Sequence, residues 1–435
     1  MEVFEKLGAF MCRAHILEVG RERLHQVRNR LQLLLVTEDA SENTLSEMLH
    51  DFDCPVFCAL TMHDVERLFG FHGTKVIGFR RHPLTQQAQE ALRDCRVVRR
   101  RPMPEHPRVA VLGASGIGRH HANWWSLEGA QVSAFLGSSE TSVAETAAAL
   151  HGLFGFSGRG FLDLGQLLDE ARPDIVDVCL PPALHYRACR QALEAGCHVL
   201  CEKPFVFDAA LGAAELRGHG QELVRLARRQ GLCLGVCTQY VMAAREALRL
   251  WREAHPGETL THFAGRLVSP ARGREPLPWR TWVDLAPHLL AAAQVLGGGA
   301  HLDADSIERH GSGHLAAASF VCSGRSGDLD CSIETSHAET EPFNVRQLSL
   351  NGEFYDIGGA RDEQGVFQMT ITTPRGTVQS PDMLRLLIRS FLRGKAEVPP
   401  RMACQNMDWL LATLGWPENV VPGAEPQPLM REQEA

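Results

Sequence analysis

Between residues 108 and 239, short apolar runs alternate with stretches of helical periodicity, and this alternation restricts the fold more than any other feature of the chain. Apolar runs of this length are typical of strands that are buried on both faces. Strands separated by helices form a parallel sheet with helices on both faces, and ligands bind beyond the carboxyl ends of its strands. We expect strands at residues 109–112, 131–136, 175–180, 198–204 and 232–239.

A Gly-rich turn, GASGIG, follows the first of these strands and precedes a helical pattern. Glycines allow a tight turn and let backbone amides approach a pyrophosphate, while the start of the helix supplies partial positive charge. Serine replaces the second glycine of the G-x-G-x-x-G fingerprint here. The strand, the turn and the helix together predict a dinucleotide site at Gly113, Ser115, Gly116, Ile117 and Gly118.

The run HVLCEKPF, residues 198–205, carries an acid and a base to the end of an expected strand, where Pro204 stops it. Beyond the carboxyl end of a central strand, Glu202 and Lys203 would lie near the nicotinamide end of a dinucleotide. A salt-bridged strand end without a further role is the alternative interpretation.

After residue 240 the pattern changes. A helical pattern at 282–296 precedes many short runs of strand composition, which Gly and Asn turns separate, as is typical of an antiparallel sheet. We expect strands at 316–323, 327–336, 344–352 and 365–374, and closing helices at 382–393 and 403–414.

The first hundred residues predict a separate α/β/α sandwich domain. Residues 31–49 read as a buried strand, an acidic turn and a helix, and residues 54–79 as strand, helix, turn and strand, whereas residues 7–30 look helical with a break at Gly20. A basic and then proline-rich stretch follows and is typical of a linker. The predicted domains are 1–92, a linker at 93–107, a Rossmann domain at 108–240, a second domain at 241–420 and a tail at 421–435.

Composition excludes several classes of protein. The net charge of −8 argues against a chain that binds nucleic acid over its whole length. No apolar run is long enough to span a bilayer, and the N-terminus has no hydrophobic signal-peptide region. The thirteen cysteines include no C-x-x-C pair, which favours buried reduced thiols over a metal site. We therefore expect a cytoplasmic protein with neither membrane contact nor a bound metal.

Three motifs in order, GASGIGRHHA, LPPALH and AGCHVLCEKP, resemble the Gfo/Idh/MocA oxidoreductase family over residues 108–416. The resemblance implies an α/β protein in which a Rossmann domain precedes an α+β domain with a large, mostly antiparallel sheet. It implies a sugar, polyol or related small-molecule alcohol or carbonyl as substrate, and a homo-oligomer formed through that sheet. It also places Pro181, Pro182, His185, Glu202 and Lys203 at the cofactor.

The family pattern carries an Asp and a His four residues apart on the helix that enters the second domain, here Asp284 and His288. Residues at i and i+4 share one helix face, and Pro287 would fall in the first turns, where proline is tolerated. The resemblance implies that His288 is the base that takes the alcohol proton, that Lys203 donates to the reacting oxygen and that Asp284 orients them. A partly buried histidine near a helix-terminal charge is the alternative.

The second expected strand ends in FLGSSET, which bears on the choice of cofactor. An acid at this position binds the ribose 2′-hydroxyl of NAD. Ser138 and Ser139 stand there instead, so one repulsion against a 2′-phosphate is removed and two hydroxyls can bind it, although no Arg follows at once to clamp it. The sequence therefore favours NADP over NAD.

Two segments near the N-terminus, RAHILEVGRERL and VTEDASENT, resemble the ribosomal family of kink-turn RNA-binding proteins across residues 7–79. The family signature G-N-E-x-x-K reads G-R-E-R-L-H at residues 20–25. The resemblance implies RNA as a partner, but Asn and Lys of the signature are replaced, so Arg21, Arg23, Arg28 and Arg30 could hold phosphates only without reading sequence. A domain used for protein contacts is the alternative.

Two classes of function remain open. One is an NAD(P)-dependent dehydrogenase or reductase, and the other is a non-catalytic dinucleotide sensor coupled to RNA or protein through the N-terminal domain. The joint presence of Lys203, Asp284 and His288 favours the enzyme, because a sensor needs none of them.

Overall fold

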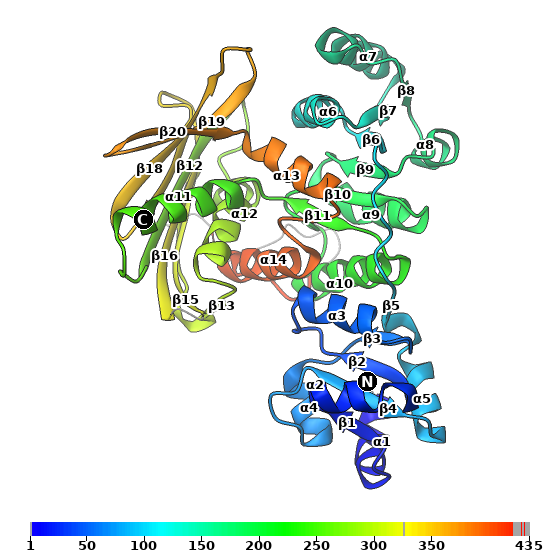
Figure 1. Ribbon diagram of the computed structural model, residues 1–435. Coiled ribbons are helices and arrows are strands. Elements are labelled where there is room, and N and C mark those ends of the chain that lie inside the picture. Colours follow the sequence, from blue (N-terminus) through cyan, green and yellow to red (C-terminus); the bar gives the residue numbers. More distant parts are fainter. Residues whose placement is uncertain (1, 325–326, 421–427, 429, 431–435) are drawn as a thin grey trace. The chain divides into compact units, whose positions relative to one another are not determined.

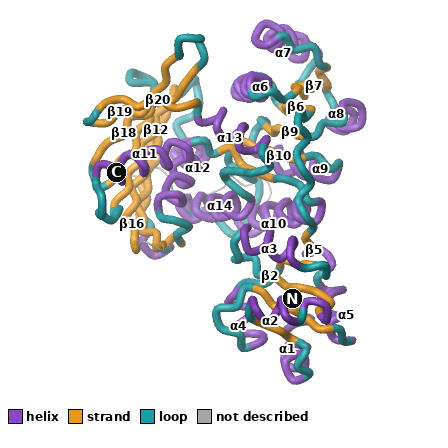
Figure 2. Tube along the Cα trace, viewed as in Figure 1, coloured by secondary structure: helices purple, strands orange, loops and turns teal. Residues whose placement is uncertain are grey.

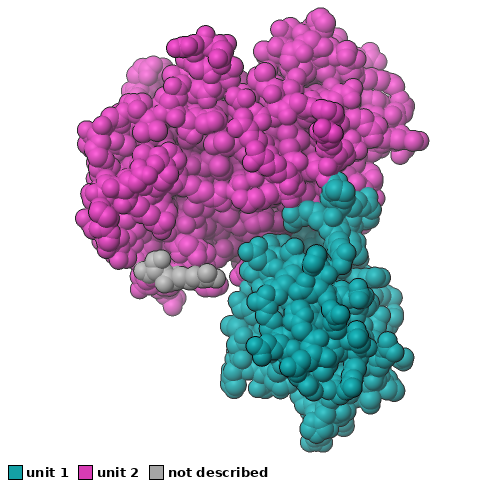
Figure 3. All heavy atoms as spheres, in the orientation of Figure 1, with its two compact units in different colours: residues 1–102, 224–232 teal, residues 103–223, 233–435 magenta. Residues whose placement is uncertain are grey.

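The computed structural model of the chain describes residues 2–324, 327–420, 428 and 430 (Figure 1). The predicted tail at 421–435 therefore lies almost wholly outside the described residues. The chain divides into two compact units: residues 1–102 with 224–232 form unit 1, and residues 103–223 with 233–435 form unit 2 (Figure 3).

Unit 1 is built on a five-stranded sheet. Its strands are β1 (Leu17–Val19), β2 (Leu31–Val36), β3 (Val56–Cys58), β4 (Val76–Arg80) and β5 (Arg96–Val97). Its helices are α1 (Glu2–Arg13), α2 (Arg21–Gln26), α3 (Glu42–Asp51), α4 (Met62–Phe69) and α5 (Pro83–Ala91). The spatial order is β1-β4-β2-β3-β5, and only β2 and β3 pair in parallel among these described strands.

Successive residues of β2 face opposite sides of this sheet, as a strand requires. Leu33 and Leu35 belong to one buried cluster together with residues of α1, α4 and α5, whereas Leu34 and Val36 belong to another together with residues of α2 and α3. Helices therefore cover both faces, and unit 1 is the α/β/α sandwich that the sequence predicts.

Two details of unit 1 differ from the prediction. Residues 17–19 are a strand rather than helix, because α1 ends at Arg13 and the chain reverses at His15 (φ 51°) to pair with β4. Strand β5 lies inside the predicted linker. Its Val97 is buried opposite Val56 of β3, so the sheet continues beyond residue 92.

The first part of unit 2 is a six-stranded sheet in which every pair of described neighbours is parallel. Figure 2 shows its strands β6, β7, β9 and β10 in orange with purple helices around them. Its strands are β6 (Arg108–Leu112), β7 (Gln131–Leu136), β8 (Arg159–Phe161), β9 (Ile175–Val178), β10 (His198–Glu202) and β11 (Leu234–Cys237). The helices between them are α6 (Ile117–Leu127), α7 (Glu140–Phe154), α8 (Leu164–Ala171), α9 (His185–Glu194) and α10 (Ala213–Gln230), of which residues 224–230 belong to unit 1. The order β11-β10-β9-β6-β7-β8 reverses at β6, which is the dinucleotide-binding topology.

The second part of unit 2 is a nine-stranded sheet. Its strands are β12 (His262–Pro270), β13 (His301–Leu302), β14 (Glu308–Ser312), β15 (Leu315–Gly324), β16 (Gly327–Ala338), β17 (Val345–Leu350), β18 (Glu353–Arg361), β19 (Phe367–Thr373) and β20 (Gly376–Pro381). Its helices are α11 (Tyr240–Ala254), α12 (Pro278–Leu296), α13 (Met383–Leu392) and α14 (Pro400–Leu414). Among the described pairs only β12 and β16 run parallel, so the prediction of a Rossmann domain followed by a mostly antiparallel sheet is confirmed.

Helix α12 begins at Pro278, four residues before the expected start, and this corrects the interpretation of Pro287. Proline is favourable at the first helical position, where a backbone N–H would have no partner within the helix. Trp279 and Trp282 in the first turns are buried. Pro287 therefore lies in the helix interior rather than in its first turns. Asp284 is in the second turn, so its carboxylate does not act as a charge at the helix N-terminus. Within the described residues, no helix combines the length and the apolar character needed to cross a bilayer.

Candidate active site

The Gly-rich turn joins β6 to α6 where the strand order reverses. Gly113 and Gly116 have φ angles of 82° and 54°, which favour glycine, and a Cβ atom on Gly116 would meet no atom within 4 Å. A Cβ atom on Gly118 would lie 2.1 Å from the carbonyl oxygen of Gly113, so only glycine lets the helix begin this close to the strand. Ser115 and Ile117 are exposed on the outside of the turn. An open backbone before a helix start suits a pyrophosphate, so the predicted residues fit a dinucleotide.

Lys203 and Asp284 meet at the centre of the site. Lys203 Nζ donates to Asp284 Oδ1 at 2.8 Å and to the backbone carbonyl oxygen of Asp284 at 2.7 Å. His337 Nε2 donates to the other carboxylate oxygen, Oδ2, at 3.1 Å. Arg274 Nη2 lies 3.6 Å from that same oxygen. Both oxygens of Asp284 therefore face donors.

The charges of this pair stabilise each other. Burial lowers the pKa of Lys203, but the charges of Asp284 and Glu202 outweigh burial and raise this pKa above its usual value. Burial raises the pKa of Asp284, but the charge of Lys203 and the hydrogen bond from His337 outweigh burial and hold this pKa well below its usual range. At neutral pH Lys203 is thus a charged hydrogen-bond donor, and Asp284 is an acceptor.

These side chains line a cavity of about 470 Å³ within unit 2. Residues after the Gly-rich turn and after β9 and β10 form one side, and residues at the start of α12 and the end of β16 form the other. The lining includes Ile117, Leu180, Pro182, Glu202, Lys203, Arg274, Trp279, Arg280, Asp284 and His337. The cavity therefore extends from the predicted cofactor turn to the Lys203–Asp284 pair, and its volume is within the range of small-molecule sites.

His288 does not line this cavity. Its side chain is buried, and its Nδ1 has no hydrogen-bond partner among the described residues. Its ring faces that of Tyr240, with 5.1 Å between the ring centroids. Burial and the positive charge of Lys203 lower the pKa of His288 to about 3. The His288 ring is therefore neutral at physiological pH, which a general base requires. With this lowered pKa, however, the ring binds a proton only weakly.

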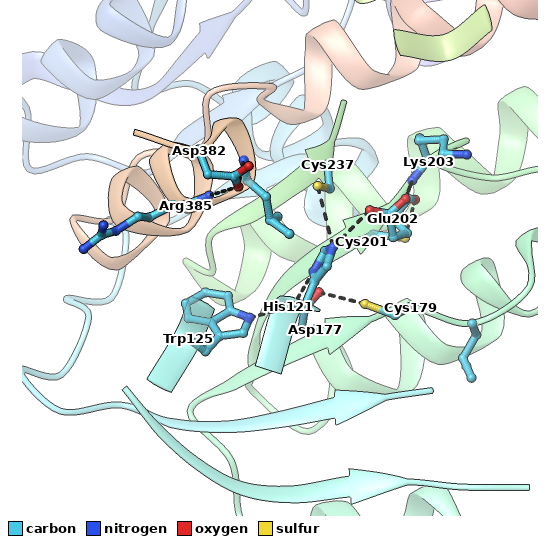
Figure 4. Close-up of polar contacts among 12 residues, drawn as sticks. His121, Trp125, Asp177, Cys179, Cys201, Glu202, Lys203, Cys237, Asp382 and Arg385 are labelled. Atoms are coloured by element: carbon cyan, nitrogen blue, oxygen red, sulfur yellow. Dashed lines mark hydrogen bonds and ion pairs between the residues drawn. The ribbon is translucent and has the colours of Figure 1, made fainter. Parts of the chain in front are cut away.

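A completely buried histidine lies beneath Glu202 (Figure 4). His121 Nδ1 is 2.8 Å from Asp177 Oδ2, and His121 Nε2 is 3.1 Å from Glu202 Oε1. Carboxylates only accept hydrogen bonds, so both ring nitrogens donate and the ring is charged. Burial opposes this charge, yet Asp177 raises the pKa of His121 well above its usual value. Burial likewise raises the pKa of Glu202, but His121 and Lys203 lower it to about 2.

The remaining predicted cofactor residues occupy three kinds of position. Ser138 is exposed after β7, and Ser139 caps α7 by accepting a hydrogen bond from the Ser142 amide at 3.2 Å. Pro182 lines the cavity, and Pro181 precedes it in the same turn. His185 is completely buried, and its ring nitrogens lie 2.9 and 2.7 Å from the carbonyl oxygens of Pro204 and Leu180. His185 thus connects the loop after β9 to the loop after β10 through these two contacts.

Sequence reasoning missed His337, His121 and Asp177. His337 continues the inward-facing alternation of β16, after Leu329, Cys331, Ile333 and Thr335, so an imidazole in a buried register was the available signal. Asp177 is likewise a charged residue in the middle of the buried strand IVDV. His121 follows the Gly-rich turn, but nothing in the sequence distinguished it from the exposed His120.

Comparison with known proteins agrees with this geometry. Residues 107–238 match the Gfo/Idh/MocA oxidoreductase family, which has an NAD-binding Rossmann fold. The matched residues span the parallel sheet of unit 2, so this part of the chain is similar to the Rossmann domain of that family.

Individual relatives are dehydrogenases of sugars and polyols. D-Glucoside 3-dehydrogenase of Escherichia coli (strain K12) is 35% identical over 98 residues, which is 22% of this chain and 27% of that protein. UDP-N-acetylglucosamine 3-dehydrogenase of Acidithiobacillus ferrooxidans is 28% identical over 202 residues, which is 46% of this chain and 58% of that protein. The chain thus spans less than two thirds of either curated relative.

Solved structures extend the likeness of fold. The Acidithiobacillus ferrooxidans enzyme covers 71% of this chain and 97% of its own, with a TM-score of 0.54 and 20% identity. Scyllo-inositol dehydrogenase from Lactobacillus casei, with bound NAD(H) and scyllo-inositol, covers 71% of this chain and 96% of its own, with a TM-score of 0.53 and 15% identity.

Proposed function

We propose that this chain is an NAD(P)-dependent oxidoreductase that interconverts an alcohol and a carbonyl on a sugar, a polyol or a related small molecule. The observation that carries the proposal is the charged Lys203–Asp284 pair, which lines the same cavity as Ile117 of the Gly-rich turn. A group that donates to the reacting oxygen is thereby next to the expected cofactor site. The sugar and polyol dehydrogenases among its relatives support the substrate class.

The backbone around Gly113, Gly116 and Gly118 would hold the pyrophosphate, and Glu202 and Lys203 would lie toward the nicotinamide. When bound, the nicotinamide supplies the site that accepts or donates hydride. The exposed Ser138 and the helix start beside it support NADP as the preferred form, because serine rather than an acid follows the end of β7; Glu140, in the first turn of α7, is the carboxylate nearest in sequence.

In the proposed reaction, Lys203 donates a hydrogen bond to the substrate oxygen and stabilises the negative charge that develops there. Asp284 keeps Lys203 protonated and in place. We retain His288 as the predicted base, because its ring is neutral and lies one helical turn from Asp284, although its side chain is buried outside the cavity lining. Trp279 and Arg280 also line the cavity, and the Arg280 guanidinium lies over the Trp279 ring at 5.3 Å.

The test is binding followed by turnover. NADPH and NADH fluorescence titrations with purified protein should show saturable binding, and mass spectrometry should identify any nucleotide that copurifies. Assays with glucosides, UDP-N-acetylglucosamine and inositols, each with NAD and NADP, should reveal hydride transfer at 340 nm. Nucleotide binding without turnover of any alcohol or carbonyl would favour the dinucleotide sensor instead.

For the N-terminal unit we propose that contact with RNA is weak and not sequence-specific. Arg21 pairs with Glu47, and Arg23 pairs with Glu18, so two of the four predicted phosphate contacts are already engaged. Arg28 and Arg30 are exposed. Titration of the whole protein with a kink-turn and with a plain duplex at two salt concentrations tests this proposal. A kink-turn preference that survives the higher salt would overturn it.

We also propose that copies of the chain associate through the solvent-exposed face of the large sheet. That face is hollowed by a cavity of about 840 Å³ over β12, β15 and β16. Light scattering on the purified protein gives the mass in solution, and a mass of 48.0 kDa would contradict the proposal.

A further inference from the structure

We propose that His337 is a positioning residue for the reaction: it fixes the carboxylate of Asp284 so that one oxygen stays on Lys203. The inference rests on the proposed function in that Lys203 is taken as the group that acts on substrate. Its central claim, that His337 controls Lys203 through Asp284, can be tested without any substrate.

The geometry assigns one carboxylate oxygen to each partner. Asp284 Oδ1 accepts from Lys203 at 2.8 Å, and Oδ2 accepts from His337 at 3.1 Å. Rotation of the carboxylate about its Cβ–Cγ bond would break both hydrogen bonds together. The His337 side chain is 2% exposed and the Lys203 side chain is 15% exposed, so neither can follow such a rotation into solvent.

Arg274 cannot replace His337 in this role. Its guanidinium lies 3.6 Å from Oδ2, which is beyond a good hydrogen bond, and its side chain is 47% exposed. Arg274 also belongs to residues 271–277, between β12 and α12, whereas His337 is held within β16 by backbone pairing to β12. Without His337, the carboxylate would be free to turn toward Arg274 and water.

The tautomer of His337 is set by its second neighbour. The Asp284 carboxylate only accepts, so His337 Nε2 carries a proton. In the neutral ring Nδ1 is then an acceptor, and the completely buried Thr281 hydroxyl lies 3.3 Å away to donate to it. Thr281 and Asp284 are both on α12. The same helix therefore carries Thr281, which orients the His337 ring, and Asp284, which that ring orients.

Both nitrogens of His337 are thus engaged, which argues that the ring acts through Asp284 rather than on substrate directly. In metal sites, the hydrogen-bond partners of the ligands fix the orientation of those ligands in a comparable way. Removing such a partner typically costs about 10–100-fold in activity.

The test uses the scarcity of lysine in this chain, which has only Lys6, Lys75, Lys203 and Lys395. Protein grown with lysine labelled with ¹³C at Cε should give four NMR signals, and Lys203→Arg assigns the one of interest. Three variants are compared: His337→Leu removes the donor, His337→Gln keeps an N–H group that can reach Asp284, and Thr281→Val removes the group that sets the tautomer.

In the parent protein, the Lys203 signal should titrate with a pKa above the usual value for lysine, because the charges of Asp284 and Glu202 favour the ammonium form. In His337→Leu its pKa should fall, because Asp284 no longer stays on Lys203. Glu202, His288 and Cys237 also face Lys203, and His337→Leu replaces none of them. His337→Gln should restore most of the parent value. An unchanged Lys203 titration in His337→Leu, with NADPH still bound, would overturn the inference.

Kinetics supply a second readout once a substrate is found. His337→Leu should lower kcat about 10–100-fold with little change in the KM for cofactor, and His337→Gln should recover part of kcat. Equal losses in His337→Leu and His337→Gln would contradict positioning. Failure to find any turnover in the parent protein would count against the proposed function, whereas the lysine titration would still decide the role of His337. Tryptophan fluorescence verifies that each variant is folded.

Discussion

Lys203 contacts Asp284 twice, through the side-chain oxygen and through the backbone carbonyl oxygen, although 81 residues separate them. The first residue follows a strand of the parallel sheet, and the second lies on the helix that packs against the antiparallel sheet. Donating to the carbonyl as well as to the carboxylate fixes the ammonium group against the backbone of α12. The site therefore depends on both parts of unit 2 at once.

Lys203→Met should abolish turnover while leaving cofactor affinity nearly intact. The substitution keeps an unbranched side chain of similar length but removes the donor, and loss of such a group in the transition state typically costs about 10²–10⁴-fold in rate. Steady-state kinetics and NADPH titration separate the two effects. Lys75→Met, at an exposed lysine of unit 1, is the matched control and should behave like the parent.

Gly118→Val should prevent dinucleotide binding. Its Cβ atom would lie 2.1 Å from the Gly113 carbonyl oxygen and 3.1 Å from Cys179 Cβ, so the turn must open and the amides must move. Calorimetry with NADPH measures the loss. Gly152→Ala in α7 is the control, because its Cβ atom meets nothing within 4 Å and alanine favours helix by about 1 kcal/mol. Tight binding by Gly118→Val would mean that the cofactor site lies elsewhere.

His288 should make unit 2 less stable as the pH falls. Burial lowers its folded pKa to about 3, below the unfolded value of about 6.5, so the unfolded state binds one more proton between these values. This contribution to stability is complete above about pH 6.5 and decreases by about 1.4 kcal/mol per pH unit as the pH falls toward the folded pKa. Urea unfolding between pH 7 and pH 4 measures the slope.

The seven tryptophans all lie between residues 124 and 416, outside unit 1, so tryptophan fluorescence follows unit 2 alone in these experiments. His288→Leu should flatten the slope of the unfolding free energy against pH. His301→Leu, at an exposed histidine of the same unit, should leave the slope unchanged. Identical slopes for all three proteins would show that His288 is not held neutral by burial.

His121→Leu should destabilise unit 2 by about 3–5 kcal/mol, since it leaves Asp177 and Glu202 buried without their shared cation. Urea unfolding followed by tryptophan fluorescence measures the change. His120→Leu removes the neighbouring, exposed histidine and should change the unfolding free energy by less than about 0.5 kcal/mol. A similar small effect for both variants would contradict the charged interpretation of His121.

Ser138→Asp should shift the preference from NADP toward NAD. A carboxylate at the end of β7 repels a 2′-phosphate and accepts a hydrogen bond from a 2′-hydroxyl. The ratio of the two dissociation constants is the measurement. Ser142→Asp, within α7, is a control for added negative charge near the same turn. A parent protein that already prefers NAD would refute the role given to the serines.

The parallel sheet could be predicted because each of its main strands is a continuous apolar run, and periodicity detects such runs directly. Strand β8 was missed because a strand of three residues is too short to show a pattern of apolar residues. The sequence predicted that the second sheet is mostly antiparallel, but it did not predict which strands pair. Pairing between strands far apart in the chain, such as β12 and β16, leaves no local signal.

The residues of the candidate site also divide into those that the sequence predicted and those that it did not. Lys203 and Asp284 were found because they belong to motifs, and the structure brings them together. His337 belongs to no motif, and its importance comes from the register of β16, which places it opposite Ser269 and beside α12. Pro287 was misplaced because the sequence gives helix starts less well than helix cores, and Pro278 is itself a favourable first residue.

Residues 271–277, which carry Arg274 and Glu275 to the cavity, connect β12 to α12 without belonging to either. The reacting groups are fixed on strands and a helix, whereas these two side chains extend from a short exposed connection. Substitutions or insertions in that connection could change which hydroxyl-bearing molecule is accepted while the proton and hydride chemistry stays intact. Selection for a new substrate would therefore act first on residues 272–276, which are exposed, whereas Ala271 and Leu277 at the two ends of the connection are buried and half-buried.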